Sequence, residues 1–323
     1  MSDQPARVVF LDAATFGDLF LKRFTDRWSC TIHDRTAPGE VIRRLAGHTI
    51  AVTNKVAFDK AVLNSSEAKD LKLIVVAATG TDIIDRAEAA RLGIHVSNVP
   101  GYATQSVAQF TLALILELAT RAGRYADDVE RGAWEKSPVF SLLTHPTVEL
   151  AGKKLGIIGY GSIGRTVAQM ARGFGMEILV AARPGAPATN DRVPFEQLLR
   201  EADIVSLHCP LAPETRNLIN RDSLSLMKPT AFLINTARGA LIDEVALVEA
   251  LREKRIAAAA LDVVTVEPPP ADHPIIRAAK ELDDLIVTPH TAWGTREARE
   301  RLLKEVEENI RAFLQGLDRN RVA

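Results

Sequence analysis

A glycine-rich turn, GYGSIG at residues 159–164, constrains the fold of this 323-residue chain more than any other segment. It follows the apolar run 154–158 and leads directly into a helical stretch, so the pattern predicts a strand, a tight turn and a helix. In a dinucleotide-binding fold, Gly159 permits the turn, Gly161 lets the backbone approach a pyrophosphate, and Gly164 lets helix and strand pack closely. We therefore predict a dinucleotide site here; the alternative is a structural glycine turn.

Short strand-like runs alternate with helical stretches along most of the chain, which predicts an α/β fold with parallel sheets. In the first hundred residues these runs are 7–12, 49–53, 71–79 and 94–99. From Lys153 onward six more follow, at 154–161, 177–182, 203–210, 231–237, 257–263 and 284–290. We expect two doubly wound parallel-sheet lobes, of which the second carries the glycine-rich turn.

Two long helices are predicted outside this alternation. The segment 106–123 is too apolar all round for a surface helix, and Pro100-Gly101 before it marks a break. We expect it to bridge the two lobes; the alternative is a core helix inside one of them. A last helix is predicted from Thr295 to about Leu314.

Composition narrows the function classes. The 40 basic and 41 acidic side chains give a formal net charge of −1, which offers no electrostatic footprint for nucleic acid. No apolar run is long enough to span a bilayer, and the polar start lacks a signal-peptide pattern, so we expect no membrane association and a cytoplasmic location. Cys30 and Cys209 lie far apart, which predicts buried thiols and neither a metal site nor a disulfide.

Three residues, Arg238, Glu267 and His290, each come shortly after a predicted strand of the second lobe. The carboxyl ends of parallel strands are where ligands bind, so one nucleotide fold presents all three beside a cofactor. An arginine clamps a carboxylate, a histidine transfers protons near neutral pH, and a neighbouring carboxylate stabilises the imidazolium and fixes its tautomer. The set suits reversible hydride transfer to a 2-oxo acid. For His290 considered alone, a structural histidine is the alternative.

Arg183 bears on the choice of nicotinamide cofactor. It ends the second predicted strand of the nucleotide lobe, where NAD-selective folds usually place an Asp or Glu for the ribose 2′-hydroxyl. An arginine there pairs with a 2′-phosphate instead. We expect NADP(H) to be preferred, with NAD(H) as a possible cofactor. The alternative is that Arg183 stacks on adenine or points to solvent.

Polar loops provide further candidate contacts. In the first lobe, Asn54 and Lys55 follow one predicted strand, and the backbone amides around Gly80 follow the next as a small anion nest. For Lys55, an exposed surface lysine is nearly as good an interpretation as a substrate contact. In the second lobe, Asp262 is interpreted as a partner of the nicotinamide amide, or else as a loop cap.

Seven segments together resemble the D-isomer-specific 2-hydroxyacid dehydrogenases: VAATGTDIID, SVAQF, GKKLGIIGYGSIG, HCPLAPETRNLI, LINTARGALIDE, ALDVVTVEP and TPHTAWGTREA. The likeness covers nearly the whole chain and looks most like the glycerate dehydrogenase or hydroxypyruvate (glyoxylate) reductase branch. It implies a Rossmann NAD(P)-binding domain, residues 102–291, inserted in a flavodoxin-like substrate domain of residues 1–101 and 292–323. It also implies that Arg238, Glu267 and His290 are the catalytic set.

The resemblance implies the remaining site residues as well. Cofactor contacts would be Gly159, Tyr160, Gly161, Ser162, Ile163, Gly164, Arg183, Cys209, Pro210, Thr215, Thr236, Ala237 and Asp262. Substrate contacts would be Asn54, Thr79, Gly80, Arg238 and His290. Family members are usually homodimers joined through the nucleotide lobe, with an arm that matches residues 131–143 here, so a partner subunit is expected near Trp134 and Phe140. The sequence leaves open whether four further residues line the substrate pocket: Lys55, Trp134, Phe140 and Trp293.

The expected activity is NAD(P)-dependent reduction of a small 2-oxo acid, hydroxypyruvate or glyoxylate, to the D-2-hydroxy acid, with His290 as general acid/base. Arg238 and the Thr79–Gly80 amides would hold the carboxylate and stabilise developing charge. The alternative from another class is a non-catalytic NAD(P)-sensing module, such as a co-repressor-like protein. The lack of a basic patch counts against that alternative.

Overall fold

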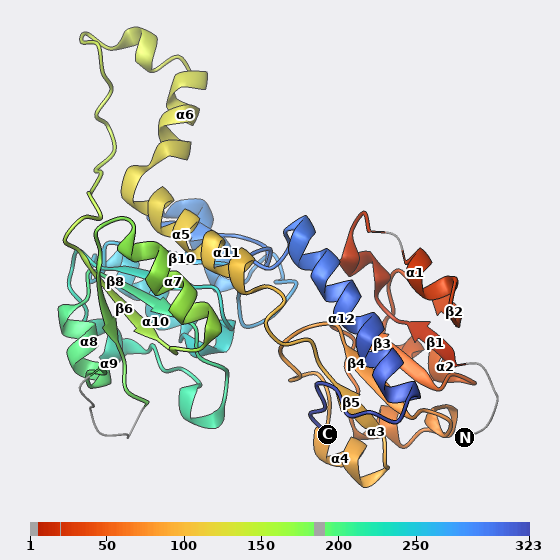
Figure 1. The fold of residues 1–323 in the computed structure, drawn as a ribbon. Coiled ribbons are helices and arrows are strands. Elements are labelled where there is room, and N and C mark those ends of the chain that lie inside the picture. The colour runs from red at the N-terminus through yellow and green to blue at the C-terminus, as the bar shows by residue number, and fades with distance from the viewer. Residues whose placement is uncertain (1–5, 20, 184–190) are drawn as a thin grey trace. The chain divides into compact units, whose positions relative to one another are not determined.

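The computed structural model describes residues 6–19, 21–183 and 191–323. The chain divides into two compact units, drawn as a ribbon in Figure 1. Unit 1 comprises Met1–Ala103 and Gly294–Ala323, and unit 2 comprises Thr104–Trp293. The expected boundaries, at 101/102 and 291/292, lie two residues before the observed ones.

Unit 1 contains a parallel sheet in the order β2-β1-β3-β4-β5. Its strands are β1 Arg7–Phe10, β2 Ser29–Ile32, β3 Ile50–Thr53, β4 Leu73–Val76 and β5 His95–Ser97. This is the flavodoxin-like order, in which ligands bind at the carboxyl ends of the strands. Every residue of β3 and β4 is buried, as expected for parallel strands covered on both faces.

Strand β2 was not predicted from the sequence. It lies at one end of the sheet, and Ile32, its one large apolar side chain, is 41% exposed. An edge strand needs only one neighbour and little burial, so apolar periodicity does not reveal it.

The α-helices of unit 1 are α1 Lys22–Thr25, α2 Val41–Leu45, α3 Lys60–Leu63, α4 Arg86–Arg91 and α12 Arg296–Leu314. The hydroxyl of Thr295 accepts a hydrogen bond from the Ala298 amide at 3.3 Å and caps α12. The helix packs against β4 through residues three and four apart, Leu302, Leu303, Val306 and Ile310. The predicted last helix therefore belongs to the sheet formed by the start of the chain.

Unit 2 contains a second parallel sheet, in the order β11-β10-β9-β8-β6-β7. Its strands are β6 Lys154–Ile158, β7 Glu177–Val180, β8 Ile204–Leu207, β9 Phe232–Asn235, β10 Ala258–Leu261 and β11 Leu285–Val287. The strand order reverses between β6 and β8. In doubly wound folds such a reversal opens a crevice at the carboxyl edge, where nucleotides bind.

Helices pack two separate cores onto the faces of this sheet. The helices are α5 Thr104–Thr120, α6 Ala122–Glu130, α7 Ser162–Arg172, α8 Phe195–Glu201, α9 Arg221–Leu226, α10 Glu244–Arg252 and α11 Pro274–Glu281. One core joins α5 and α7 to Phe232 and Ile234 of β9, and the other joins α8, α9 and α10 to the intervening Leu233. Single 3-10 turns occur in both units at η1 Ala13–Phe16, η2 Pro38–Glu40, η3 Ser66–Ala68, η4 Trp134–Lys136, η5 Pro213–Thr215 and η6 Gly239–Leu241.

Helix α5 lies wholly in unit 2, against α7, β9 and β10. This placement matches the alternative of a core helix within one unit. Among residues 6–19, 21–183 and 191–323, no helix combines the length and the apolar character needed to cross a membrane.

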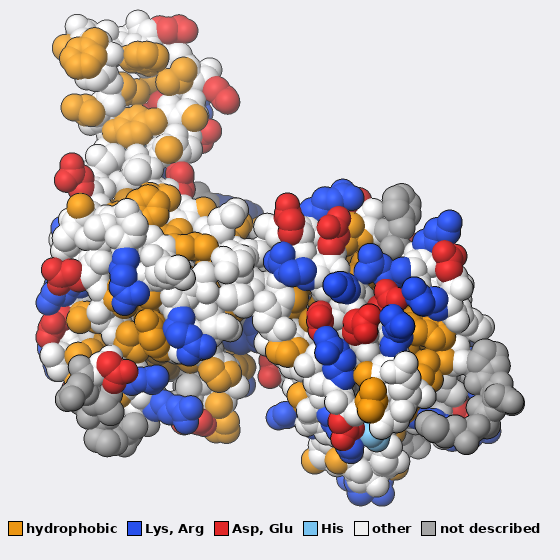
Figure 2. Space-filling view, in the orientation of Figure 1, with side chains coloured by type: hydrophobic (Ala, Val, Ile, Leu, Met, Phe, Trp, Pro, Cys, Tyr) orange, Lys and Arg blue, Asp and Glu red, His pale blue; other side chains and the backbone are white. Residues whose placement is uncertain are grey.

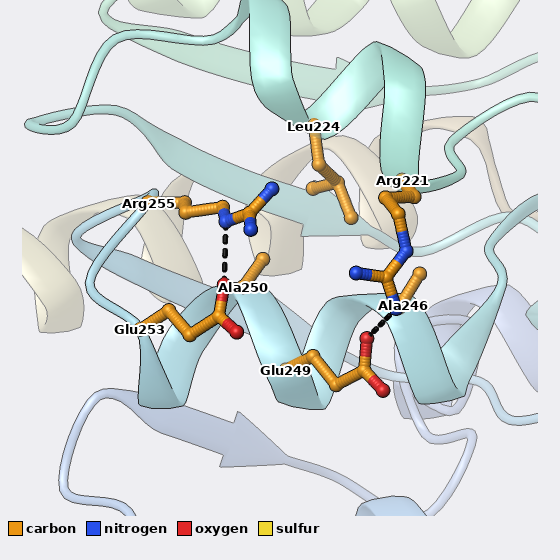
Figure 3. A pocket seen from close by; sticks show the side chains of 7 residues that line it. All are labelled: Arg221, Leu224, Ala246, Glu249, Ala250, Glu253 and Arg255. Carbon is orange, nitrogen blue, oxygen red and sulfur yellow. Dashed lines mark hydrogen bonds and ion pairs between the residues drawn. The ribbon is translucent and has the colours of Figure 1, made fainter.

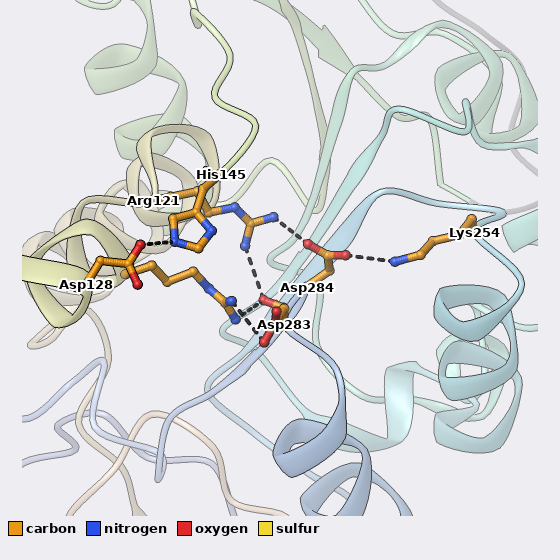
Figure 4. Close-up of polar contacts among 7 residues, drawn as sticks. Arg121, Asp128, His145, Lys254, Asp283 and Asp284 are labelled. Atoms are coloured by element: carbon orange, nitrogen blue, oxygen red, sulfur yellow. Dashed lines mark hydrogen bonds and ion pairs between the residues drawn. The ribbon is translucent and has the colours of Figure 1, made fainter. Parts of the chain in front are cut away.

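The arm, residues 122–149, leaves the core at the end of α5 and contains α6 and η4 (Figure 1). Arg121, at its base, is buried and donates from Nη2 to Oδ1 of Asp284 at 2.7 Å. Arg124 pairs with Asp283 at 2.9 Å, and Lys254 pairs with the other oxygen of Asp284 at 3.0 Å. Figure 4 shows Arg121 and Lys254 meeting Asp284 in the segment before β11, and ion pairs therefore fix the base of the arm to the sheet.

Replacing Leu118 of α5 by Ala is expected to lower the free energy of unfolding by about 2–5 kcal/mol. The reason is that this side chain is 1% exposed in the α5–α7 core and would leave a cavity. The matched control is Val245→Ala, because this side chain of α10 is 57% exposed. That substitution should change the free energy of unfolding by less than about 0.5 kcal/mol. Urea unfolding of both variants measures the difference, and equal effects would contradict the packing described.

Candidate active site

The turn after β6 is shaped by glycine. Gly159 has φ +98°, and a Cβ there would lie 2.3 Å from the backbone nitrogen of Cys209. A Cβ on Gly164 would lie 2.3 Å from the carbonyl oxygen of Gly159, so α7 packs directly on the turn. Gly161 caps α7 and has open space where its Cβ would be. This cradle fits a pyrophosphate held by backbone N–H groups at a helix N-terminus.

The loop after β8 lies against this turn. The hydroxyl of Thr215 accepts from the Ala212 amide at 2.8 Å and donates to the Pro210 carbonyl at 2.8 Å. Thr215 therefore holds the shape of the loop. Burial raises the pKa of the Cys209 thiol to about 11, so this predicted cofactor contact is a protonated thiol at neutral pH and not a nucleophile.

The other predicted cofactor residues differ in their exposure. Ser162 is exposed at the start of α7, and Tyr160 and Ile163 are half-buried. Thr236 is buried, with its hydroxyl 3.0 Å from that of Thr111 on α5, and the Ala237 amide donates to the side chain of Asn235 at 3.0 Å. Arg183 is exposed just after β7, and residues 184–190, which follow it, lie outside the described part of the chain.

Arg238, Glu267 and His290 follow three neighbouring strands, β9, β10 and β11. In the middle strand, Leu261 pairs with Asn235 on one side and with Val287 on the other. The three loops therefore begin at the same edge of the sheet and at nearly the same level.

His290 and Glu267 form a close pair. Nδ1 of His290 lies 2.6 Å from Oε2 of Glu267, and the other carboxylate oxygen accepts from the Val264 amide at 3.2 Å. Because an ionised carboxylate can only accept, Nδ1 donates in this hydrogen bond, which leaves Nε2 as the atom that can exchange a proton with a ligand. Nε2 has no hydrogen-bond partner among the described residues, and the side chain is 23% exposed.

Asp262 organises the loop that carries His290. Its buried carboxylate accepts from the Thr288 hydroxyl at 2.6 Å and from the amides of Thr291 and Ala292, each at 2.9 Å. Its carbonyl accepts from the His290 amide at 2.8 Å, which supports His290 at φ +53°. The observed contacts are those of the loop cap, and a contact with the nicotinamide amide remains a prediction.

Sequence reasoning missed a buried cluster that supports the loop carrying Glu267. Both oxygens of Glu244 accept from Thr265, one from its amide at 2.8 Å and one from its hydroxyl at 2.7 Å. Nε2 of His273 lies 3.3 Å from the same carboxylate. The sequence feature that marks this cluster is the acidic pair at 243–244, but such a pair is equally typical of the start of an ordinary helix. Its partners, 21 and 29 residues further on, cannot be identified from spacing.

Arg238 is half-buried and extended, and its Nη1 donates to the Ala237 carbonyl at 2.8 Å. The next residue, Gly239, touches the neighbouring loop: a Cβ there would lie 2.0 Å from the carbonyl carbon of Val264. The backbone after Arg238 therefore packs directly on the segment that leads to Glu267, which couples the two loops sterically.

Two loops at the carboxyl edge of the unit 1 sheet carry the other predicted substrate contacts. Asn54, after β3, is 4% exposed, and its Nδ2 has no hydrogen-bond partner in the described chain. Thr79 is exposed and Gly80 half-buried after β4, and the Thr79 hydroxyl donates to the Val99 carbonyl at 3.0 Å. Lys55 is exposed.

A surface pocket of unit 2 lies between helices α9 and α10 (Figure 3). Its charged side chains pair with one another: Arg221 with Glu249, and Arg255 with Glu253 at 2.6 Å. The residues that line this pocket include no histidine.

Comparison with known proteins finds a matching family, related sequences and similar solved structures. The family described as D-isomer specific 2-hydroxyacid dehydrogenase, NAD binding domain, matches residues 112–292. The chain is 40% identical over 318 residues to a glycerate dehydrogenase of Methylorubrum extorquens. The aligned residues cover 97% of this chain and 98% of that protein. The chain is 36% identical over 319 residues to a hydroxypyruvate reductase of Blautia hydrogenotrophica, covering 96% and 97%. The solved structure of an acyclic imino acid reductase (Bsp5), in complex with NADPH and D-Arg, is similar with a TM-score of 0.84 at 29% identity, covering 98% of this chain and 100% of that one.

A doubly wound nucleotide-binding unit with a histidine–glutamate pair at its carboxyl edge has the groups that a nicotinamide-dependent dehydrogenase needs. The chain belongs to the D-isomer specific 2-hydroxyacid dehydrogenase family. It is an NAD(P)-dependent oxidoreductase of that family. The family and the α/β class with two parallel-sheet lobes, both predicted from the sequence, are thereby confirmed.

Replacing His290 by Ala is expected to lower kcat by about 10²–10⁴-fold, because the general acid/base is lost. Binding of NADPH, followed by its fluorescence, should be retained, since the glycine cradle is untouched. The control His33→Ala changes a histidine of unit 1 and should keep turnover. Unchanged turnover in His290→Ala would rule out this role.

Proposed function

We propose that the protein reduces hydroxypyruvate or glyoxylate to the corresponding 2-hydroxy acid. The observation that carries the proposal is the 2.6 Å pair of His290 and Glu267 at the carboxyl edge of a dinucleotide-binding sheet. The relatives from M. extorquens and B. hydrogenotrophica are named for glycerate and for hydroxypyruvate. These two acids differ by one hydride and one proton, which is the chemistry that such a pair assists.

The proposed mechanism assigns a separate task to each side chain. A bound nicotinamide supplies the hydride for C2 of the oxo acid. His290 donates a proton from Nε2 to the ketone oxygen, and Glu267 stabilises the imidazolium before that transfer. Arg238 binds the substrate carboxylate through its guanidinium. Asn54, Thr79 and Gly80 are proposed as further substrate contacts.

NADP(H) is the proposed preferred cofactor, with NAD(H) as the second. Arg183 is exposed at the end of β7, where the adenosine ribose binds in this kind of fold. The related Bsp5 structure contains NADPH, whereas the matching family is described by NAD binding. A guanidinium at this position favours the 2′-phosphate through charge-assisted hydrogen bonds.

A homodimer joined through unit 2 is also proposed. The arm exposes large apolar side chains, visible as hydrophobic patches on that segment in Figure 2: Val129, Trp134, Val139, Phe140, Leu143 and Val148. Phe140 is 91% exposed and Leu143 is 86% exposed. Large apolar side chains that are clustered and exposed to this extent mark a surface that binds another protein. The indole of Trp134 donates to the Phe140 carbonyl at 3.0 Å, which holds the end of the arm in shape for a partner.

The rival reading as a non-catalytic nucleotide sensor does not account for the site. A sensor needs the glycine cradle but has no use for a proton-transfer pair at the same sheet edge. Turnover is therefore the property that separates the two readings.

The test follows the absorbance of NADPH, and separately NADH, while hydroxypyruvate, glyoxylate, pyruvate and larger 2-oxo acids are offered to the purified protein. We expect turnover with hydroxypyruvate or glyoxylate to exceed that with the larger acids. Nucleotide binding without turnover on any acid would overturn the proposed function in favour of a sensor.

Replacing Arg183 by Ala is expected to raise KM for NADPH about tenfold or more, because a charge-assisted contact to the 2′-phosphate is lost. KM for NADH should change little, since that cofactor lacks the phosphate. Arg200→Ala, at an exposed arginine of α8 paired with Glu196, is the matched control. Equal effects on NADPH and NADH would contradict phosphate selection by Arg183.

A further inference from the structure

Asp12 is a buried carboxylate for which the mechanism above has no use. It follows β1, and the Leu11 amide beside it donates to the Val52 carbonyl of β3 at 3.1 Å. The side chain is 7% exposed. Asp12 therefore lies at the carboxyl edge of the unit 1 sheet, next to the loop that begins after Thr53.

The carboxylate of Asp12 binds the backbone of that loop. The Asn54 amide donates to both of its oxygens, at 2.9 and 3.0 Å, and the Lys55 amide donates to Oδ2 at 2.6 Å. Successive backbone N–H groups that converge in this way form an anion-binding nest. The chain fills this nest with its own carboxylate, so these amides are not available to an incoming substrate.

A second contact closes the same loop from the other side. The hydroxyl of Thr53 accepts from the Val56 amide at 3.0 Å and donates to the Val56 carbonyl at 3.2 Å. Thr53 is fully buried. The backbone of residues 54–56 is therefore held at both ends by side chains that lie outside it.

This support acts on one side chain in particular. The Nδ2 group of Asn54 is buried without a hydrogen-bond partner in the described chain. A buried donor left unpaired is costly, and native proteins keep few such groups. An amide donor fixed in this way is suited to a ligand oxygen, and a 2-oxo acid presents carboxylate and ketone oxygens.

We infer that Asp12 is a positioning residue of the substrate site: its carboxylate holds residues 54–55 so that Nδ2 of Asn54 is presented to an oxygen of the 2-oxo acid. The inference rests on the proposed function, which it deepens by naming how the Asn54 donor is oriented.

The energetics of Asp12 separate positioning from a purely structural role. Burial raises the pKa of the Asp12 carboxyl, although hydrogen bonds from Asn54, Lys55 and Val56 act to lower it. A raised pKa means that folding favours the protonated form of the carboxyl. The ionised form therefore lowers the free energy of unfolding at neutral pH. Removing the charge should therefore harm substrate binding more than it harms stability.

The test compares Asp12→Asn with the wild-type protein. The substitution keeps the shape but places an NH₂ donor where a carboxylate oxygen accepts. KM for hydroxypyruvate or glyoxylate at saturating NADPH should rise at least about fivefold, since a buried hydrogen-bond arrangement is lost. The NADPH dissociation constant should stay close to the wild-type value. Hydrogen exchange of segment 53–57 should accelerate, while that of segment 73–76 in β4 should not.

Two further variants sharpen the comparison. Asp85→Asn removes the same kind of contact, a carboxylate that accepts from the Glu88 amide at 3.0 Å, but at the start of α4, and should leave KM unchanged. Thr53→Val removes the hydroxyl that holds Val56 and that also hydrogen-bonds Asp12, and it should reproduce the rise in KM.

An unchanged KM in Asp12→Asn would overturn the inference, whether or not exchange of the loop accelerates. A lowered urea midpoint with unchanged KM would assign Asp12 a structural role only. If the wild-type protein turns over no 2-oxo acid, the proposed function fails. The exchange of segment 53–57 then decides whether Asp12 holds the loop, and an unchanged rate would overturn that as well.

Discussion

The parallel pairing of β9, β10 and β11 is the constraint on which the candidate site depends. Because Leu261 of the middle strand pairs with Asn235 and Val287, the loops to Arg238, Glu267 and His290 start side by side. A shift of one residue in either pairing would turn every side chain of the shifted strand to the opposite face of the sheet. Backbone hydrogen bonds of the sheet bring these loops to one edge, and the 2.6 Å contact of His290 with Glu267 then joins two of them.

Buried carboxylates then shape the loops that the strands deliver. Asp262 binds amides beside His290, Glu244 binds the loop that leads to Glu267, and Asp12 binds the loop of Asn54. An irregular loop leaves N–H groups without partners, and an ionised oxygen satisfies them with short, strong hydrogen bonds. The same device thus occurs in both units, at the strand ends where ligand-binding residues are expected.

Much of this architecture was readable from local pattern. The alternation of apolar runs and helical stretches predicted ten of the strands, and the turn at 159–164 marked the nucleotide unit. The prediction missed β2, whose Ile32 is exposed at a sheet edge. It also placed α5 as a bridge, because an all-round apolar helix has the same composition in either position. Glu244, His273 and Asp12 were missed since a supporting residue is defined by its partner, and the Asp12 partners lie 42 and 43 positions along the chain.

The sequence by itself determined the family, the two α/β lobes and the identity of the residues placed at strand ends, because these depend on residue type and short-range spacing. Only the tertiary structure decided that Glu267 reaches Nδ1 of His290 and that Asp262 caps the His290 loop. It also decided that the side-chain Nδ2 of Asn54 is a buried donor without a partner in the described chain. Such properties depend on distances and burial between segments remote in sequence, which strand pairing and packing set together.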